Sequence, residues 1–179
     1  MVKNFSDIRK KQIIDVAEKM MVAARTAPKA RGVDNLEIIL LTDEELFVLA
    51  EHMKLISERD NVAFFKRDAD NVLQSDAVLL IGVSYKSLGL KNCGWCGWKN
   101  CDEKENHSEH PCAYNLHDLG VAVGSAVSIA ADHRIDNRVM FSIGKASIEL
   151  NFFNESIKAA FGIPLSASNK NPFFDRKPI

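Results

Sequence analysis

The chain has 179 residues, of which 46% are hydrophobic and 26% charged, a composition typical of a single globular domain. Its formal net charge of −1 argues against a nucleic-acid-binding protein, because phosphate contacts require a surplus of basic residues. The N-terminal region has no uncharged run typical of a secretory signal, and the longest apolar stretch, residues 119–131, is too short to span a membrane. We therefore expect a cytoplasmic protein, in which thiols stay reduced and structural disulfides are rare.

The first half of the chain shows alternating helical and strand patterns. Apolar residues recur at three- and four-residue steps over residues 6–27, which predicts an amphipathic helix that ends where a proline follows. Residues 36–42 and 76–85 are short apolar runs, and each predicts a buried strand. Between these strands, helices are expected over residues 43–59 and 64–74, the first with acidic residues in its opening turn.

A long helix is expected over residues 112–132, after a region (89–111) where glycine, asparagine and charged residues break the regular pattern. Gly120 and Gly124 lie four residues apart and so share one face of this helix. Their small size allows another helix to approach closely. We predict helix packing at this face, with a role in a cofactor pocket as the alternative.

The last part of the chain contains one more helix and one more strand. Asp136 is expected to cap a helix that runs to about residue 150, and residues 157–165 predict the final strand. The predicted order is helix, strand, helices, strand, cysteine region, helices, strand. Because this order is not a regular alternation of strands and helices, we predict an α+β fold in preference to a doubly wound sheet.

All four cysteines of the chain fall in one 20-residue window, with the spacing C-x2-C-x4-C-x10-C: Cys93, Cys96, Cys101 and Cys112. Gly94 and Gly97, within the same stretch, let the backbone fold tightly around a small inorganic group. Clustered thiolates at such gaps are the ligands that a zinc ion or an iron–sulfur cluster requires. The sequence therefore predicts a metal centre held by these four cysteines.

Three interpretations of the cysteine window compete. A disulfide framework would require an oxidising compartment. Structural zinc is a stronger alternative, although zinc sites favour two C-x2-C pairs and only one is present. An iron–sulfur cluster fits best, because gaps of two and four followed by a distant cysteine resemble plant-type ferredoxin ligation with the first two gaps reversed. That reversal leaves the cluster type open; our prediction is [4Fe–4S].

Two histidines and two tryptophans accompany the cysteines. His107 and His110 could replace a thiolate as ligands, but four thiols make this unnecessary, and we expect solvated side chains or hydrogen-bond donors around the centre. Trp95 and Trp98 flank Cys96. We expect them to anchor the loop against the core, with shielding of a cluster from water as the alternative.

Three stretches outside the cysteine window resemble the flavin-dependent nitroreductase fold. Residues 23–45 (AARTAPKARGVDNLEIILLTDEE) look like its N-terminal signature, in which a helix ends in a small-residue turn with a proline, and an asparagine, a strand and a charged helix follow. Residues 115–135 (NLHDLGVAVGSAVSIAADHRI) are similar to its long central helix at the dimer interface, and residues 162–179 (GIPLSASNKNPFFDRKPI) resemble its last strand and basic tail. With the four-cysteine insert at about 89–112, the whole chain resembles the uncharacterised proteins described as containing a ferredoxin domain.

The resemblance implies a single nitroreductase-like α+β domain over residues 1–179, with a central, mostly antiparallel sheet flanked by helices. It also implies a homodimer with intertwined helices and FMN bound between the subunits. Carried over by position, the turn at residues 27–29, Asn35 and Arg176 would approach the flavin or its phosphate, and a cation such as Lys29 or Arg176 suits a phosphate. The chain departs from the family in having Lys29 where serine is usual and in lacking an arginine-rich start.

The sequence contains no G-x-S-x-G motif, no P-loop and no H-E-x-x-H motif. Three functional hypotheses remain, and they leave the status of the protein as an enzyme open. The first is a redox protein that carries electrons on an iron–sulfur cluster. The second is a flavin oxidoreductase in which the cluster relays electrons to or from FMN, with a partner protein or a nicotinamide as the donor. The third is a binding or assembly module whose loop is held together by zinc.

Overall fold

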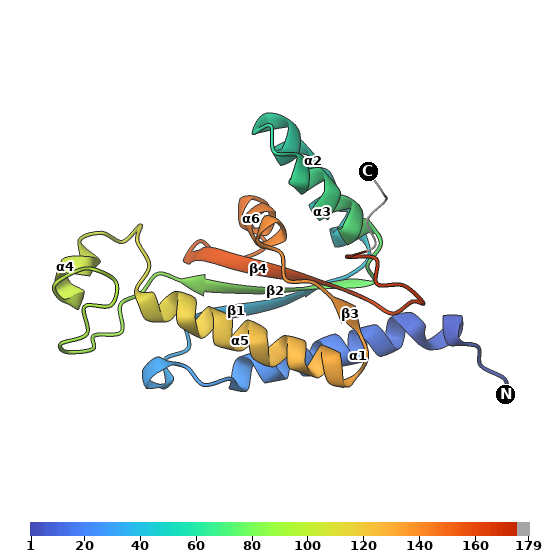
Figure 1. Cartoon of the computed structure of the whole chain (residues 1–179), viewed down its shortest axis with the longest axis horizontal. Helices are drawn as coiled ribbons and strands as arrows, with labels where there is room; N and C mark the ends of the chain where they lie inside the picture. The colour runs from blue at the N-terminus through green and yellow to red at the C-terminus, as the bar shows by residue number, and fades with distance from the viewer. Residues whose placement is uncertain (175–179) are drawn as a thin grey trace.

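A four-stranded antiparallel sheet lies between two layers of helices in the computed structural model, which describes residues 1–174 (Figure 1). The strands follow the spatial order β1-β2-β4-β3 and are β1 (Leu36–Leu41), β2 (Ala77–Ser84), β3 (Asp136–Asn137) and β4 (Ile157–Ser166). β2 pairs with β1 on one side and with β4 on the other. Its apolar side chains are therefore buried on both faces, which explains the continuous apolar sequence.

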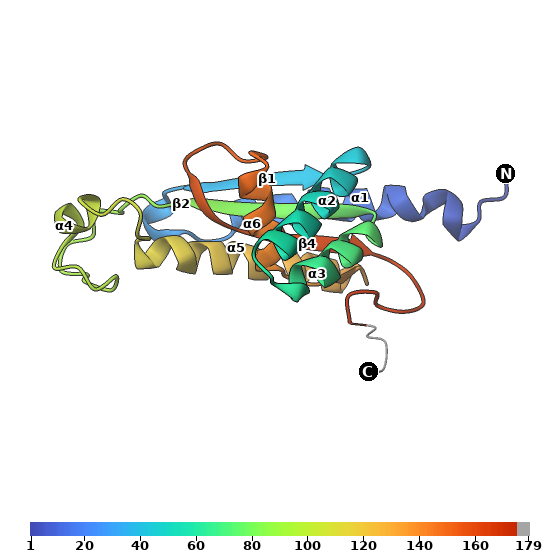
Figure 2. The same cartoon turned by 90° about the horizontal axis from the view of Figure 1, so that it is seen from above.

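One face of the sheet is covered by α1 (Phe5–Thr26) and α5 (Ala113–Asp132), which lie side by side (Figures 1 and 2). Ile13, Ala17 and Met20 recur at helical spacing along α1 and are completely buried in the hydrophobic core of this layer. Leu119 contributes to the same core from α5. This layer supports the start of α5, beside which the cysteine region lies.

The other face is covered by α2 (Glu44–Arg59), α3 (Ala63–Leu73) and α6 (Phe141–Glu149) (Figure 1). Helix α6 packs directly on the backbone of β4, because a Cβ atom at Gly144 would lie 1.9 Å from the carbonyl oxygen of Ala160. Gly162 of β4 is equally crowded, with its Cβ position 2.0 Å from Cγ2 of Ile143. Glycine at both positions permits this close helix–strand contact.

Seven of the predicted helices and strands match the observed ones to within one residue at each end, but the eighth differs. The prediction that Asp136 caps a helix is wrong. Asp136 lies in β3 and pairs with Ser166, and α6 begins only at Phe141. The backbone N–H and C=O of Met140 both hydrogen-bond to Gly162 at 2.9 Å, so pairing with β4 takes precedence over a local helix cap.

The cysteine region leaves the sheet after β2 and returns at the start of α5, projecting beyond the two layers at the end of the molecule opposite the N-terminus (Figures 1 and 2). It contains the short helix α4 (Cys101–Glu105), which the sequence pattern did not predict. The single helical turn η1 (Ala30–Gly32), between α1 and β1, was not predicted either. Within residues 1–174, every helix is too short or too polar to cross a membrane.

Candidate functional site

Four cysteines line one small pocket in the projecting segment. Cys93 and Cys96 lie in the turns that precede α4, and Cys101 is the first residue of that helix. Cys112 directly precedes α5 and is buried, with 7% of its surface exposed, while the other three are half-buried. All four are free thiols. The structure therefore gathers the four predicted metal ligands around a common space, without a disulfide among them.

Turns with positive φ angles shape the first part of this pocket. Gly94 (φ 62°) and Gly97 (φ 87°) adopt left-handed conformations that are accessible to glycine at little cost. Asn92 (φ 58°) does the same, and asparagine tolerates this region better than most residues. The close alternation of cysteines and turn residues lets Cys93 and Cys96 face the same pocket as the two cysteines that begin helices.

Hydrogen bonds fix the two cysteines at the helix starts. The side chain of Asn100 accepts a hydrogen bond from the backbone N–H of Glu103 at 2.8 Å and so caps α4, which begins at Cys101. The buried N–H of Cys112 donates to Oδ1 of Asn115 at 3.0 Å. Because α5 is 20 residues long, the partial positive charge at its N-terminus favours negative charge beside Cys112.

The spacing of the thiols bears on the kind of metal centre that they suit. Four thiolates bound at about 2.3 Å to one tetrahedral zinc ion have sulfur atoms about 3.8 Å apart. Within residues 1–174, the only group of three or more cysteine, histidine or acidic side chains with ligand atoms all within 4.8 Å of one another is His107, Glu109 and His110. No three thiols are therefore as close as one zinc ion requires. A zinc ion bound by all four cysteines would therefore require the loop to close around it.

The empty space between the thiols is too small for an iron–sulfur cluster in this structure. It measures about 10 Å³, which is room for about one water molecule, so the loop must widen to admit a cluster. A single side-chain rotation changes a void of this size. Gly94 and Gly97 also provide turns at which the backbone can adjust.

Aromatic stacking orders the rest of the loop. The ring of Trp98 lies parallel to that of His107, with centroids 4.0 Å apart, and Trp98 also lines the cysteine pocket. Trp95 stacks on Tyr114 of α5 at 5.2 Å, yet remains 70% exposed. The prediction that both tryptophans anchor the loop against the core is therefore wrong, because Trp98 packs within the loop and Trp95 packs on the start of α5. His110 lies with Glu109 at the exposed rim.

A lysine that the sequence reasoning did not single out is completely buried inside the loop. The Lys104 side chain has 0% exposure, and its ammonium group donates to the backbone carbonyl of Tyr85 at 3.0 Å. Lysine is rarely buried without a carboxylate partner. No signal in the run CDEKE distinguishes Lys104 from a solvent-exposed lysine of a short helix.

The two described residues predicted to approach a flavin, Lys29 and Asn35, differ in whether their donors are occupied. The Lys29 ammonium donates to three backbone carbonyls at the end of α1, those of Ala24, Arg25 and Ala27. Nδ2 of Asn35, in contrast, is buried and has no hydrogen-bond partner among the described residues. Arg176 lies outside the described residues. Of the two described candidates, only Asn35 therefore offers a free donor, which by itself is an incomplete flavin site.

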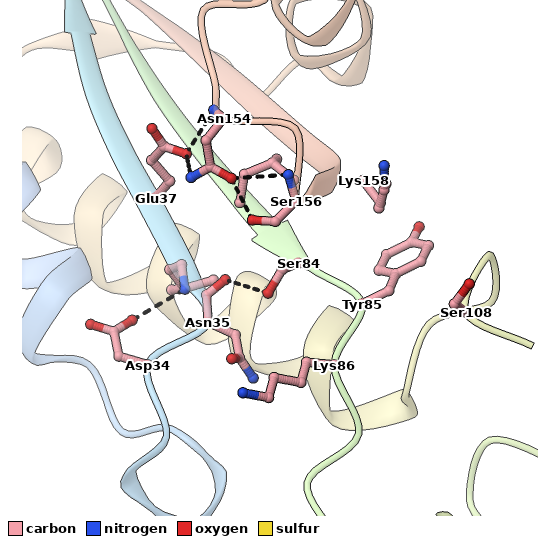
Figure 3. A pocket seen from close by; sticks show the side chains of 12 residues that line it. Asp34, Asn35, Glu37, Ser84, Tyr85, Lys86, Ser108, Asn154, Ser156 and Lys158 are labelled. Atoms are coloured by element: carbon pink, nitrogen blue, oxygen red, sulfur yellow. Dashed lines mark hydrogen bonds between the residues drawn. The ribbon is translucent and has the colours of Figure 1, made fainter. Parts of the chain in front are cut away.

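A groove of about 550 Å³, onto which Asn35 faces, lies between the end of the sheet and the cysteine loop (Figure 3). Its walls come from the start of β1, from the residues at the end of β2 and from the turn before β4. Ser108 of the cysteine loop lies on one side. The volume of the groove is in the range of small-molecule sites. None of the four cysteines lines it.

The fold and the loop together define a nitroreductase-like α+β protein with a four-cysteine segment. The structure of a nitroreductase with bound FMN from Desulfitobacterium hafniense is similar, with a TM-score of 0.60, 12% identity, and coverage of 87% of this chain and 78% of that one. A putative nitroreductase in complex with FMN from Desulfovibrio desulfuricans gives a TM-score of 0.55 at 13% identity, covering 92% and 80% of the two chains. At these identities, the likeness establishes the fold.

The chain belongs to the family described as "Uncharacterized protein containing a ferredoxin domain", which matches residues 109–176. A relative from Archaeoglobus fulgidus, described as an uncharacterized protein, is 37% identical over 185 residues and covers 99% of both chains. The predicted family and the predicted nitroreductase-like fold are thus confirmed. The family description also supports a redox type of role.

Proposed function

We propose that the protein transfers electrons by means of an iron–sulfur cluster bound to Cys93, Cys96, Cys101 and Cys112. The observation that carries this proposal is the gathering of all four free thiols around one pocket, with one C-x2-C pair where zinc sites favour two. The family description, with its ferredoxin domain, is in line with it. The thiols must be reduced to act as ligands, which agrees with the expected cytoplasmic location.

The surrounding residues have separate tasks in this proposal. The four thiolates hold the cluster, which supplies one-electron chemistry when bound. The N-terminus of α5 places partial positive charge beside Cys112. Trp95 and Tyr114 form a stacked pair beside the pocket that extends to the surface. A partner protein or a nicotinamide would then meet the cluster at this exposed end of the molecule.

Purification without oxygen, followed by measurement of iron, acid-labile sulfide and zinc, tests the proposal. We expect iron and sulfide in equal amounts, four of each per chain for a [4Fe–4S] cluster, and a broad visible absorbance that dithionite bleaches. A colourless protein with stoichiometric zinc and no sulfide would reject the cluster and support the zinc-held module. Reconstitution with iron and sulfide before the measurement separates a cluster lost during purification from one that never forms.

We also propose that two copies associate through the exposed face of α5. Leu116 is 45% exposed on this helix, and a Cβ atom at Gly120 or Gly124 would meet no atom within 4 Å in the single chain. The glycines thus leave space that the structure of one chain does not use. Another helix could approach closely there. This arrangement agrees with the homodimer that the family resemblance implies.

FMN is proposed as a second cofactor, bound where two copies meet. The unfilled amide of Asn35 favours it, since a buried donor without an acceptor is rare. Lys29 and Arg176 were predicted to approach the same group, but Lys29 would first have to release the end of α1. Equilibration of the protein with excess FMN, followed by gel filtration, tests this: retained flavin absorbance and reduction by a nicotinamide are expected. Flavin that elutes entirely as free FMN would reject it.

A further inference from the structure

Two histidines and a glutamate gather on the surface of the cysteine loop, and the proposed electron transfer uses none of them. His107, Glu109 and His110, which we call the rim group, are the only set of its kind within residues 1–174 whose ligand atoms all lie within 4.8 Å of one another. Nδ1 of His110 is 3.0 Å from Oε1 of Glu109, and Nδ1 of His107 is 3.8 Å from the same oxygen. A single carboxylate oxygen thus approaches both imidazole rings.

These distances are close to those between the ligands of a bound transition metal. Nitrogen and oxygen ligands held at about 2.1 Å from a tetrahedral zinc ion are about 3.4 Å apart. The two measured distances from the carboxylate oxygen of Glu109 lie on either side of this value. Small rotations of exposed side chains would therefore bring the three ligand atoms to one ion.

The backbone and a neighbouring ring hold the rim group in place. The N–H of His107 donates to the carbonyl of Lys104 at 2.8 Å, and the N–H of His110 donates to the carbonyl of His107 at 3.0 Å. These bonds form a turn directly after α4 that brings the two histidines together. The ring of His107 is also stacked on Trp98. Part of the ordering that metal binding would cost is therefore already present.

The ligand types and their exposure indicate which ion the rim group suits. Imidazole nitrogens favour zinc, copper and nickel, whereas magnesium and calcium prefer oxygen ligands. The side chains of His107, Glu109 and His110 are 42%, 66% and 56% exposed, which leaves room for water beside a bound ion. A closed structural zinc site has four protein ligands, whereas three ligands leave one position open. The rim group therefore suits an exchangeable zinc ion.

We propose that His107, Glu109 and His110 bind a zinc ion at the surface of the cysteine loop, separate from any metal held by the thiols. One nitrogen of each histidine and the carboxylate of Glu109 would be its protein ligands, with water at the remaining position. The ion would tie together the turn between the third and fourth cysteines. It would also hold the ring of His107 against Trp98, which lines the cysteine pocket. The proposal does not rest on the iron–sulfur function, because the rim group contains no thiol.

A zinc titration of the whole protein, prepared without oxygen, tests the proposal. Iron, sulfide and zinc are measured first, so that the metal already held by the thiols is known. Zinc chloride is then added and followed by calorimetry, with equilibrium dialysis to count the bound ions. We expect one saturable zinc ion per chain in addition to any held by the thiols. Magnesium chloride is the control ion and should not bind at this site.

Single substitutions locate the additional ion. His107→Ala and Glu109→Gln should each weaken its binding at least about tenfold, because each removes one of three ligands. His133→Ala removes an exposed histidine at the opposite end of α5 and should change the dissociation constant less than about twofold. The metal content of the thiols should be the same in all three variants, which shows that the loop is intact.

Four outcomes would overturn the proposal. These are the absence of zinc beyond that held by the thiols, equal binding of magnesium, unchanged zinc binding in His107→Ala, and loss of the thiol-held metal together with the additional zinc in both rim variants. Additional zinc that His107→Ala removes, in a protein without iron or sulfide, would refute the iron–sulfur function alone. Iron and sulfide without additional zinc would refute the rim site alone, so the two failures are distinguishable.

Discussion

Seven of the eight residues of β2 are buried, whereas between Gly89 and Pro111 the only buried residue is Lys104. The sheet and its helices are thus stabilised by removal of apolar surface from water. The cysteine loop has no such core and depends on turns, aromatic stacking and a few hydrogen bonds. A segment of this kind has little stability of its own, so what its thiols bind should decide how well it is ordered.

The two regions should therefore respond separately to substitution. Changes in the core should lower the free energy of unfolding and leave the chemistry of the thiols unchanged in the protein that remains folded. Changes in the loop should alter what the thiols bind and leave the free energy of unfolding of the core nearly unchanged. Gly144→Ala in the core and the joint replacement of Cys93 and Cys96 in the loop test this separation.

The largest effect on stability is expected from Gly144→Ala in α6. The added Cβ would lie 1.9 Å from the carbonyl oxygen of Ala160, and neither backbone can move without separating α6 from β4. We expect a loss of about 3 kcal/mol or more in the free energy of unfolding, measured by urea denaturation. Lys19→Ala, at an exposed position of α1, is the control and should change the free energy of unfolding by less than about 0.5 kcal/mol. Equal stability of the two variants would contradict the packing described for α6.

Replacement of Cys93 and Cys96 together by alanine should remove the metal and preserve the core. Iron and sulfide per chain should fall at least about tenfold, because two of four ligands are lost. The far-ultraviolet circular dichroism should remain close to that of the unmodified protein, since neither cysteine belongs to a hydrophobic core cluster.

A matched control for the cysteine variant is the replacement of His107 and His110 by alanine. Because we assign neither histidine as a ligand of the iron–sulfur cluster, this variant should retain its iron. Loss of iron from the histidine variant, or global unfolding of the cysteine variant, would show that the loop and the core are not separate in the way described here.

Gly124→Leu should weaken the proposed dimer without changing the fold of the single chain. The new side chain has open space in the single chain but would obstruct another helix against α5. We expect the dissociation constant of the dimer to rise at least about tenfold, measured by analytical ultracentrifugation, with an unchanged circular dichroism spectrum. Ser128→Leu, at an exposed position one turn further along α5, maps how far the contact extends. An unchanged sedimentation coefficient for Gly124→Leu would place the contact elsewhere.

The smallest effect concerns Glu149 at the end of α6, whose carboxylate is 21% exposed. Hydrogen bonds from Arg59, and then from His52 and Lys145, hold the pKa of Glu149 below its usual value of 4.5. A lowered pKa in the folded state stabilises the protein fully above pH 4.5, and this contribution disappears as the pH falls through the lowered value. Glu149→Gln should therefore cost about 0.5–1 kcal/mol at pH 7 and progressively less in acid.

The pH experiment is best made in the variant that lacks Cys93 and Cys96, so that loss of metal in acid does not contribute. Urea denaturation of this variant, with and without Glu149→Gln, gives the stability difference at each pH. A difference that stays constant from pH 7 down to pH 3 would refute the assignment of the effect to the Glu149 carboxylate.

The local sequence pattern predicted most of the fold, because apolar periodicity and helix- or strand-breaking residues are visible among residues that are close together in the chain. The strand of β2 and the long helix α5 were found in this way. The prediction at Asp136 was wrong because pairing with Ser166 depends on a strand 20 or more residues further along the chain. For the site, the four cysteines were evident from their spacing, whereas the buried Lys104 and the groove beside Asn35 were not.

What the sequence by itself determined was the order of helices and strands and the choice of thiol ligands, since each depends on the chemistry and spacing of neighbouring residues. The tertiary structure decided which groups lack partners. Asn35 and Lys86 lie some fifty positions apart in the chain and face one groove only because β1 and β2 are paired. Whether a donor is satisfied depends on every surface packed around it, and local sequence does not record those surfaces.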